Sequence, residues 1–332
     1  MSIGSHRLEY EVVEGWARLP EGWAFTEVVG VAVDSRERVF VFCRGPHPVI
    51  VFDKEGRFVD AWGAGQFVRP HGIFISPDDR VFLTDDEGHA VHEYTTQGAL
   101  RRRLGDGQPS DTGYVPWQSP VTRAAGPFNT VTNVARAPDG ELYVADGYGN
   151  ARVHRFAADG RLLASWGEPG SGPGQFNLPH GIALDRRGRV YVADRENSRV
   201  QIFSRDGALQ DIWDWVNRPC DLFIDAEERI YVAELGFIVG NEPVPHLRLM
   251  QHPPAGHAPI ARVSICTPEG ELIGRVGGEQ AVLPGNFFAP HGLCVGPRGD
   301  LYVGEVVVAT GVARRLAPLT PHCFQKLVRR SG

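Results

Sequence analysis

The sequence predicts an all-β protein, a six-bladed β-propeller that spans residues 1–332 as a single domain. Short runs rich in Val, Ile, Tyr and Phe alternate with turn residues, as expected for antiparallel strands joined by hairpins. The same pattern recurs along the chain at irregular intervals of about 40 residues or more, the period of a propeller blade. The 40 glycines and 25 prolines suit many tight turns, and no long segment has helical periodicity.

The clearest copy of the repeat runs from Phe176 to Phe203 and contains three apolar runs. Turns at Arg186–Gly188 and Arg205–Gly207 place Gly where a hairpin needs a left-handed residue, and Ala208–Trp213 supplies a fourth strand. The pattern Pro-His-Gly-Ile-Ala-Leu-Asp, then Val-Tyr-Val-Ala-Asp, then Arg-Val-Gln-Ile-Phe resembles the NHL repeat family. Four strands per copy are typical of a propeller blade.

Five related copies begin near Val28, Pro70, Val131, Pro219 and Pro290. Their second strands are predicted at Arg38–Phe42, Arg80–Thr84, Glu141–Ala145, Arg229–Ala233 and Asp300–Gly304. The last copy ends without an outer strand, whereas the N-terminal segment Leu8–Trp16 alternates in character and has no copy of its own. We therefore expect this segment to complete the last blade and to close the ring.

Three histidines occupy the same place in three copies, in the phrases Arg-Pro-His71, Leu-Pro-His180 and Ala-Pro-His291. Each begins the first strand of its blade, which lines the central channel, so the six innermost residues are Val29, His71, Thr132, His180, Cys220 and His291. Alternate blades lie about 120° apart, so three imidazoles can meet on the axis. One such histidine would simply bind channel water, but three in alternation favour a metal.

Three nitrogen ligands with an open fourth position are the arrangement of a catalytic zinc site. The sequence therefore predicts one zinc ion per chain, held by His71, His180 and His291. Iron, manganese and cobalt stay open as alternatives.

The loops after each second strand return to the rim where the histidines lie. In the first and third blades they carry Arg44 and Tyr148, and the connection 105–126 and the insertion 236–260 reach the same rim. Arg44 is either an anion-binding group or part of a salt bridge at the rim. Tyr148 is either a proton-transfer group or a packing aromatic. Acidic residues recur at the end of the second strands and are expected to cap turns: Asp85, Asp146, Asp194, Glu234 and Glu305.

Nearly the whole chain resembles peptidyl-α-hydroxyglycine α-amidating lyase. The resemblance rests on Phe42-Cys-Arg44-Gly-Pro-His, Ala145-Asp-Gly-Tyr148, the segment 166–180, and the phrases around His71 and His291. It implies a six-bladed propeller with a three-histidine zinc site in its channel and an active-site arginine at Arg44.

Two departures lie in the last motif. A methionine that lines the family's substrate pocket is Ala289 here, so we expect a wider pocket. An aspartate that helps to hold a structural calcium is Gly292 here, so calcium loses a ligand, although the carbonyls of Val31 and Ile73 could contribute.

The resemblance implies a lyase that cleaves the C–N bond of an α-hydroxy amide, giving an amide and an aldehyde acid such as glyoxylate. Arg44 would bind a carboxylate through its planar guanidinium, and Tyr148 would act as base or proton shuttle. The expected substrate is a small α-hydroxy amide or ureido acid, and the sequence does not decide whether peptides are accepted. A lactonase-like metal hydrolase and a non-catalytic NHL interaction module are the alternatives.

Composition limits the partners and the compartment. The net charge is −6, and no basic stripe is present, which argues against nucleic-acid binding. No apolar run is long enough to span a membrane, and the first residues lack a signal-peptide pattern. Five scattered cysteines without a Cys-x-x-Cys pair are typical of reduced thiols, so we expect a cytoplasmic protein. The sequence gives no indication of oligomeric state.

Overall fold

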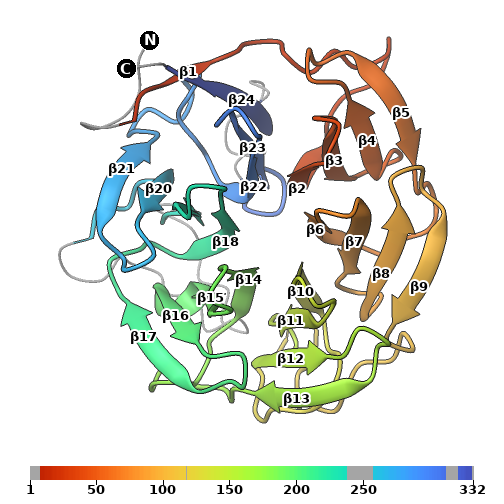
Figure 1. Ribbon diagram of the computed structural model, residues 1–332, viewed down its shortest axis with the longest axis vertical. Helices are drawn as coiled ribbons and strands as arrows, with labels where there is room; N and C mark the ends of the chain where they lie inside the picture. The colour runs from red at the N-terminus through yellow and green to blue at the C-terminus, as the bar shows by residue number, and fades with distance from the viewer. Residues whose placement is uncertain (1–7, 117, 238–256, 312–320, 331–332) are drawn as a thin grey trace.

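The computed structural model contains six four-stranded antiparallel sheets arranged around a central axis (Figure 1). It describes residues 8–116, 118–237, 257–311 and 321–330. The arrangement confirms the prediction of a six-bladed β-propeller. Within the described residues we find no helix that is both long and apolar enough to span a membrane.

The first five blades each consist of four consecutive strands, and the sixth is made from both ends of the chain. The first three blades contain β2 (Glu27–Val33), β3 (Val39–Arg44), β4 (Val49–Phe52), β5 (Phe58–Trp62), β6 (Pro70–Ile75), β7 (Arg80–Asp85), β8 (Ala90–Thr95), β9 (Leu100–Leu104), β10 (Val131–Arg136), β11 (Leu142–Asp146), β12 (Arg152–Phe156) and β13 (Leu162–Trp166). The last three contain β14 (Pro179–Leu184), β15 (Val190–Asp194), β16 (Arg199–Phe203), β17 (Leu209–Trp213), β18 (Pro219–Ile224), β19 (Ile230–Glu234), β20 (Arg262–Cys266), β21 (Leu272–Val276), β22 (Pro290–Val295), β23 (Leu301–Glu305), β24 (Phe324–Arg329) and β1 (Tyr10–Val12). One 3₁₀ turn, η1 (Arg195–Asn197), follows β15.

Strand β1 closes the ring by pairing antiparallel with β24, with Tyr10 opposite Arg329. The fully buried Tyr10 also places its hydroxyl 3.3 Å from that of Tyr231 in the preceding blade. The predicted closure is therefore confirmed, although the strand is shorter than the predicted segment 8–16. It ends early because Trp16 leaves the sheet and packs its ring 5.3 Å from that of Tyr302.

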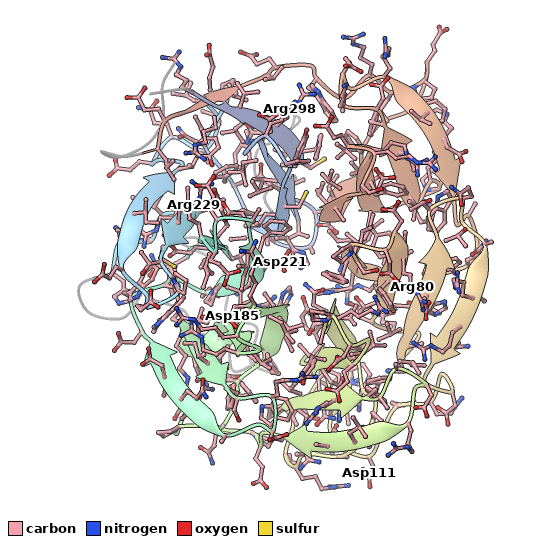
Figure 2. The ribbon with its side chains drawn as sticks, viewed as in Figure 1. Arg80, Asp111, Asp185, Asp221, Arg229 and Arg298 are labelled. Carbon is pink, nitrogen blue, oxygen red and sulfur yellow. The ribbon has the colours of Figure 1, made fainter. Side chains whose placement is uncertain are left out.

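The core lies between neighbouring blades, where the second strands are buried along their whole length, as in β11, β15 and β19. At the rim away from the histidines, Asp185 and Asp225 hold the first hairpin of their blades. Figure 2 labels Asp185 and also Arg229, the partner of Asp225. The Asp185 carboxylate accepts hydrogen bonds from the backbone and side chain of Arg189, and Asp225 does the same with Arg229. Pairing of this kind lets a buried charge be tolerated. These hydrogen bonds hold the hairpins at one rim, whereas the three histidines lie toward the opposite rim.

Candidate metal centre and active site

The three histidines meet at the centre of the ring. His71, His180 and His291 are the second residues of β6, β14 and β22 and are 1%, 2% and 3% exposed. Their ring centroids lie 4.7–4.8 Å apart, and one ligand atom from each lies within 4.8 Å of the others. The structure thus brings together the three residues that the alternation of the repeats predicted.

Each histidine is oriented by the next blade. The Nδ1 atoms of His71, His180 and His291 lie 2.7, 2.7 and 2.8 Å from the carbonyl oxygens of Thr132, Cys220 and Val29. A carbonyl only accepts hydrogen bonds, so each Nδ1 carries the proton, and each Nε2 of the neutral ring presents a lone pair. The carbonyls come from the innermost residues of the three blades without histidine. All six blades therefore contribute to the centre, three as ligands and three as supports.

Electrostatics keeps the three imidazoles neutral. Burial lowers the pKa of His71 and of His180 well below its usual range, and the neighbouring imidazoles and arginines lower both further. Burial, followed by the charge of Arg44, lowers the pKa of His291 to about 3. A metal binds the neutral imidazole, so this state is ready for coordination. Three buried, neutral, pre-oriented nitrogens fit a zinc ion with an open position.

Buried acids hold the segments that carry the histidines. Asp85 accepts hydrogen bonds from the backbone of Val68 and Arg69, just before His71. The other four acids of the series cap the incoming segments of their own blades in the same way: Asp146 binds Asn129 N, Asp194 binds Asn177 N, Glu234 binds Asn217 N, and Glu305 binds Phe288 N and Ala289 N. These acids therefore cap backbone groups, as predicted. Their hydrogen bonds fix where the innermost residues of the second to sixth blades enter the channel.

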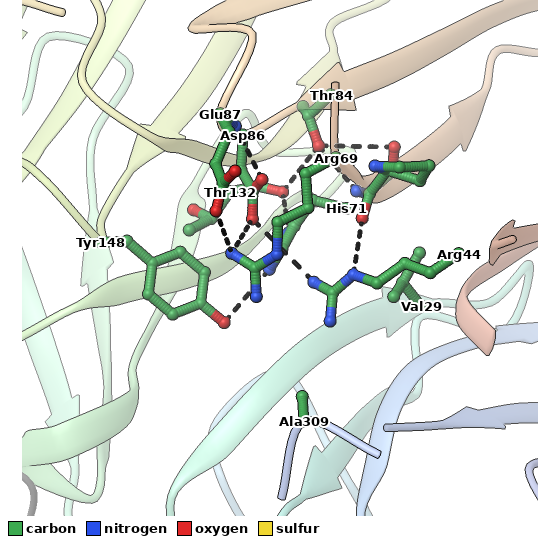
Figure 3. A network of polar contacts seen from close by, with 12 residues as sticks. Val29, Arg44, Arg69, His71, Thr84, Asp86, Glu87, Thr132, Tyr148 and Ala309 are labelled. Carbon is green, nitrogen blue, oxygen red and sulfur yellow. Dashed lines mark hydrogen bonds and ion pairs between the residues drawn. The ribbon is translucent and has the colours of Figure 1, made fainter. Parts of the chain in front are cut away.

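Tyr148 places its hydroxyl against the metal centre. Its oxygen lies 3.3 Å from Nε2 of His71 (Figure 3) and also 3.3 Å from Nε2 of His180. Arg195 Nη1 donates to the same oxygen at 3.2 Å, and the Arg69 and Arg195 guanidinium carbons lie 5.7 and 5.3 Å from the ring centroid. The preceding Gly147 has no side chain, and a Cβ there would lie only 1.9 Å from Pro179 O. The loop can therefore pack against the fourth blade, which a larger residue would prevent.

Arg44 forms a salt bridge at the rim and also faces the centre. Its Nη1 donates to Glu27 at 2.8 Å and its Nε to the Pro70 carbonyl at 3.2 Å. The other Glu27 oxygen accepts from the backbone of Val308 and Ala309. Arg44 Nη2 lies 3.9 Å from Asp86 and has no hydrogen-bond partner among the described residues (Figure 3). The salt bridge at the rim is therefore observed, and anion binding by Arg44 stays a prediction, for which Nη2 would supply the donors.

Arg195 is the functional residue that the sequence analysis missed. It lies in η1, is 5% exposed, and pairs with Glu196, which also binds Arg218. The available signal was the phrase Asp194-Arg195-Glu196-Asn197, in which two opposite charges directly follow the strand Val190–Asp194. It stands at the same place in its blade as Asp146-Gly147-Tyr148 in the preceding one.

The expectations for Ala289 and Gly292 have different outcomes. Ala289 is fully buried in the core with Val29 and Val306, so its side chain does not face an open pocket, and the expected widening there is wrong. At Gly292 a Cβ would lie 2.6 Å from Gly30 Cα, so an aspartate would fit only if one of the two backbones moved.

An acid does occur in this layer of the fifth blade. Asp221 follows the innermost residue of that blade as Gly292 follows His291. Its carboxylate accepts from Asn133 Nδ2 at 2.9 Å and from Leu293 N at 3.1 Å, and burial raises its pKa to about 7. These partners explain how the acid is accommodated and leave the calcium expectation as a prediction.

The two rim loops differ in how much of each the structure describes. The connection 105–126 borders a cleft through Pro120 and Val121, next to Tyr148. Most of the insertion 236–260 lies outside the described residues. All five cysteines are buried and free.

Comparisons with known proteins place these observations in a family context. The NHL repeat model matches residues 176–203, which form most of the fourth blade. NHL repeat-containing protein 3 of Homo sapiens is 34% identical over 218 residues, covering 62% of this chain and 60% of that protein. A probable peptidyl-α-hydroxyglycine α-amidating lyase of Caenorhabditis elegans is 34% identical over 160 residues, covering 47% of this chain and 43% of that protein. The chain thus spans less than two thirds of these relatives.

A solved structure supports the fold alone. A gluconolactonase from Xanthomonas campestris superposes with a TM-score of 0.62 at 14% identity, covering 99% of this chain and 95% of that one. The chain is therefore a six-bladed β-propeller that carries one matched NHL repeat and resembles the amidating lyases. Its relatives and structural neighbours include enzymes of more than one reaction type.

Proposed function

We propose that the protein is a metal-dependent lyase that cleaves the C–N bond of an α-hydroxy amide, releasing an amide and an aldehyde acid such as glyoxylate. One observation carries the proposal. The Tyr148 oxygen lies 3.3 Å from two imidazole nitrogens and 3.2 Å from Arg195 Nη1. A group that can transfer a proton and a cation therefore lie directly beside the three-histidine cluster. The resemblance to amidating lyases supports it.

His71, His180 and His291 would hold the metal, for which zinc is the proposed identity. A bound zinc ion would supply Lewis acidity, which makes a nearby hydroxyl group more acidic. Their Nδ1 atoms are already engaged by backbone carbonyls, which orients the three rings for binding through Nε2.

Tyr148 is the proposed proton-transfer residue. Its oxygen takes the proton of the substrate hydroxyl as its own phenolic proton passes to the departing nitrogen, and the O–H electron pair forms the carbonyl of the aldehyde acid. The C–N bond breaks, its electron pair stays on nitrogen, and nitrogen receives the proton to give the amide. No water is consumed and nothing is oxidised. Arg195 donates a 3.2 Å hydrogen bond to the Tyr148 oxygen and holds it in place for this transfer.

Arg44 is the proposed anion-binding residue. Its Nη2 faces the centre with donors to offer, while Glu27 and the Pro70 carbonyl hold the rest of the guanidinium. A substrate carboxylate at Nη2 would be oriented by a group that loses little freedom on binding. The proposed substrate is therefore a small α-hydroxy amide or ureido acid that carries a carboxylate beside the hydroxyl-bearing carbon.

Product identity tests the proposal. Zinc-loaded protein should convert α-hydroxyhippurate to benzamide and glyoxylate, and Tyr148→Phe should abolish most of the turnover. Benzoate in place of benzamide would indicate amide hydrolysis, and opening of simple lactones without any aldehyde release would indicate a lactonase-like enzyme. Protein that purifies without stoichiometric metal and binds none would support a non-catalytic module.

A further inference from the structure

One carboxylate joins three blades across the channel. Asp221, the third residue of β18 in the fifth blade, lies near the axis of the ring (Figure 2). Its Oδ1 accepts a hydrogen bond from Asn133 Nδ2 of the third blade at 2.9 Å, and its Oδ2 accepts one from Leu293 N of the sixth blade at 3.1 Å. The fourth blade separates the third from the fifth, so the bond to Asn133 crosses the channel.

All three linked residues adjoin the metal centre. Asp221 directly follows Cys220, and Asn133 directly follows Thr132. The carbonyl oxygens of Cys220 and Thr132 each lie 2.7 Å from the Nδ1 atom of a histidine in the preceding blade. Leu293 lies two residues after the last of the three histidines, on the same strand, β22. The links of Asp221 therefore connect the supports of two metal ligands with the strand that carries the third.

The strand ladder alone leaves these positions weakly held. The pairing of β18 with β19 shifts register between Pro219 and Asp221, and that of β10 with β11 shifts between Val131 and Asn133. The pairing of β22 with β23 shifts in the same way at the third histidine. At such a β-bulge one residue is left out of the ladder, so contacts from outside the ladder matter more for its position. Asp221 bonds to residues next to all three bulges.

The glycines that follow the histidines make room for this layer. A Cβ at Gly72 would lie 2.9 Å from Asn133 Oδ1, and a Cβ at Gly181 would lie 2.7 Å from the Cα atom of Asp221. The residues below the histidines are therefore closely packed, and a closely packed layer passes a displacement on to its neighbours.

We propose that Asp221 is a positioning residue for the metal centre. By linking three bulged segments, it holds the carbonyl supports of His71 and His180 and the strand of His291 at the separations that one metal ion requires. This inference rests on the metal ion of the proposed function and is independent of the reaction.

The zinc affinity of the metal-free protein tests the role. Asp221→Asn keeps the size of the side chain, but it has one acceptor oxygen where the carboxylate has two. The links to Asn133 and Leu293 use different oxygens, so one of them is lost. Competition with a chromophoric chelator should show zinc bound roughly 10- to 100-fold more weakly, the loss typical of contacts that orient metal ligands. Asn133→Ala removes the bond across the channel from the other side and should also weaken zinc binding.

A matched control separates positioning from general stability. Asp225 lies on the same inner hairpin of the fifth blade, but it holds the turn at the opposite rim through Arg229. Asp225→Asn should lower the urea midpoint of the metal-free protein and leave the zinc affinity at the wild-type value.

Exchange of the two partners provides a rescue. In the double variant Asn133→Asp, Asp221→Asn, the donor and the acceptor change places. The new amide can donate to the new carboxylate across the channel while its oxygen accepts from Leu293 N. The double variant should therefore recover most of the zinc affinity that Asp221→Asn loses.

The outcomes separate this inference from the lyase reaction. Wild-type zinc affinity in Asp221→Asn, an equal loss of affinity in Asp225→Asn, or no recovery in the double variant would overturn the role of Asp221, even if the protein cleaves α-hydroxy amides. If the affinities respond as expected but no amide releases aldehyde, the lyase proposal fails and the role of Asp221 stands. Wild-type protein that binds no zinc would overturn both.

Discussion

Replacing His291 by Asn should change how stability depends on pH in the metal-free protein. Burial and Arg44 lower the pKa of His291 to about 3, whereas a histidine in an unfolded chain titrates near 6.5. Between about pH 6.5 and pH 3, His291 is therefore protonated in the unfolded chain but neutral in the folded protein. The stability linked to this group is present above pH 6.5 and is lost as the pH falls below that value.

The two pKa values set the size of the effect. Between pH 7 and pH 5, His291 alone should cost about 2 kcal/mol of unfolding free energy, from integration of the proton-binding difference. Asn is the matched replacement because its side-chain amide can still donate to the Val29 carbonyl, as Nδ1 does at 2.8 Å. It removes the titrating group while keeping this contact.

Urea unfolding at pH 7 and pH 5, in the presence of a chelator, measures the difference for both proteins. The loss of stability on acidification should be smaller in His291→Asn by about 2 kcal/mol. Taking the difference between the proteins cancels the groups that both share. Equal losses would show that His291 takes up its proton over the same pH range in the folded and unfolded states, and would refute the argument that the centre holds neutral imidazoles.

Three further changes probe the site and its support. Tyr148→Phe should lower kcat on α-hydroxyhippurate by roughly 100-fold or more, while the metal content measured by elemental analysis stays at the wild-type value. Arg44→Lys keeps a positive charge but loses the planar fork, so binding of carboxylate substrates should weaken by about 1–3 kcal/mol; unchanged kcat/KM across acidic substrates would remove Arg44 from the site. Gly292→Asp restores the family's acid where a Cβ would lie 2.6 Å from Gly30 Cα, so we expect a loss of about 1–3 kcal/mol in urea unfolding, and an unchanged midpoint would contradict the close packing.

The repeat made the ring and its histidines predictable. Once one copy defines which residue begins the innermost strand, the same position in each copy identifies His71, His180 and His291 without any knowledge of side-chain contacts. Closure of the ring by the N-terminal segment was predictable because the last repeat had only three strands and the segment 8–16 had no repeat of its own. These inferences depend on the order of residues along the chain.

The supporting contacts could not be predicted in this way. Arg195 reaches Tyr148 because η1 turns back toward the channel, and its partner Glu196 also binds Arg218 from the next blade. The expectation for Ala289 failed because the fate of a shortened side chain depends on how the surrounding core closes around it. Such contacts join residues of different blades, and their geometry is fixed only when the blades pack.

The seam between the first and last blades couples chemistry to closure of the ring. His291 donates to the Val29 carbonyl across this seam, and Glu27, which holds Arg44, also binds the backbone of Val308 across it. Strand β1 pairs with β24, so the sixth blade cannot form until both strands have been synthesised. A nascent chain could therefore form several blades and still lack an oriented third ligand and a fixed arginine. Activity should appear only when the ring has closed, so a chain that stops before β24 should be inactive rather than partly active.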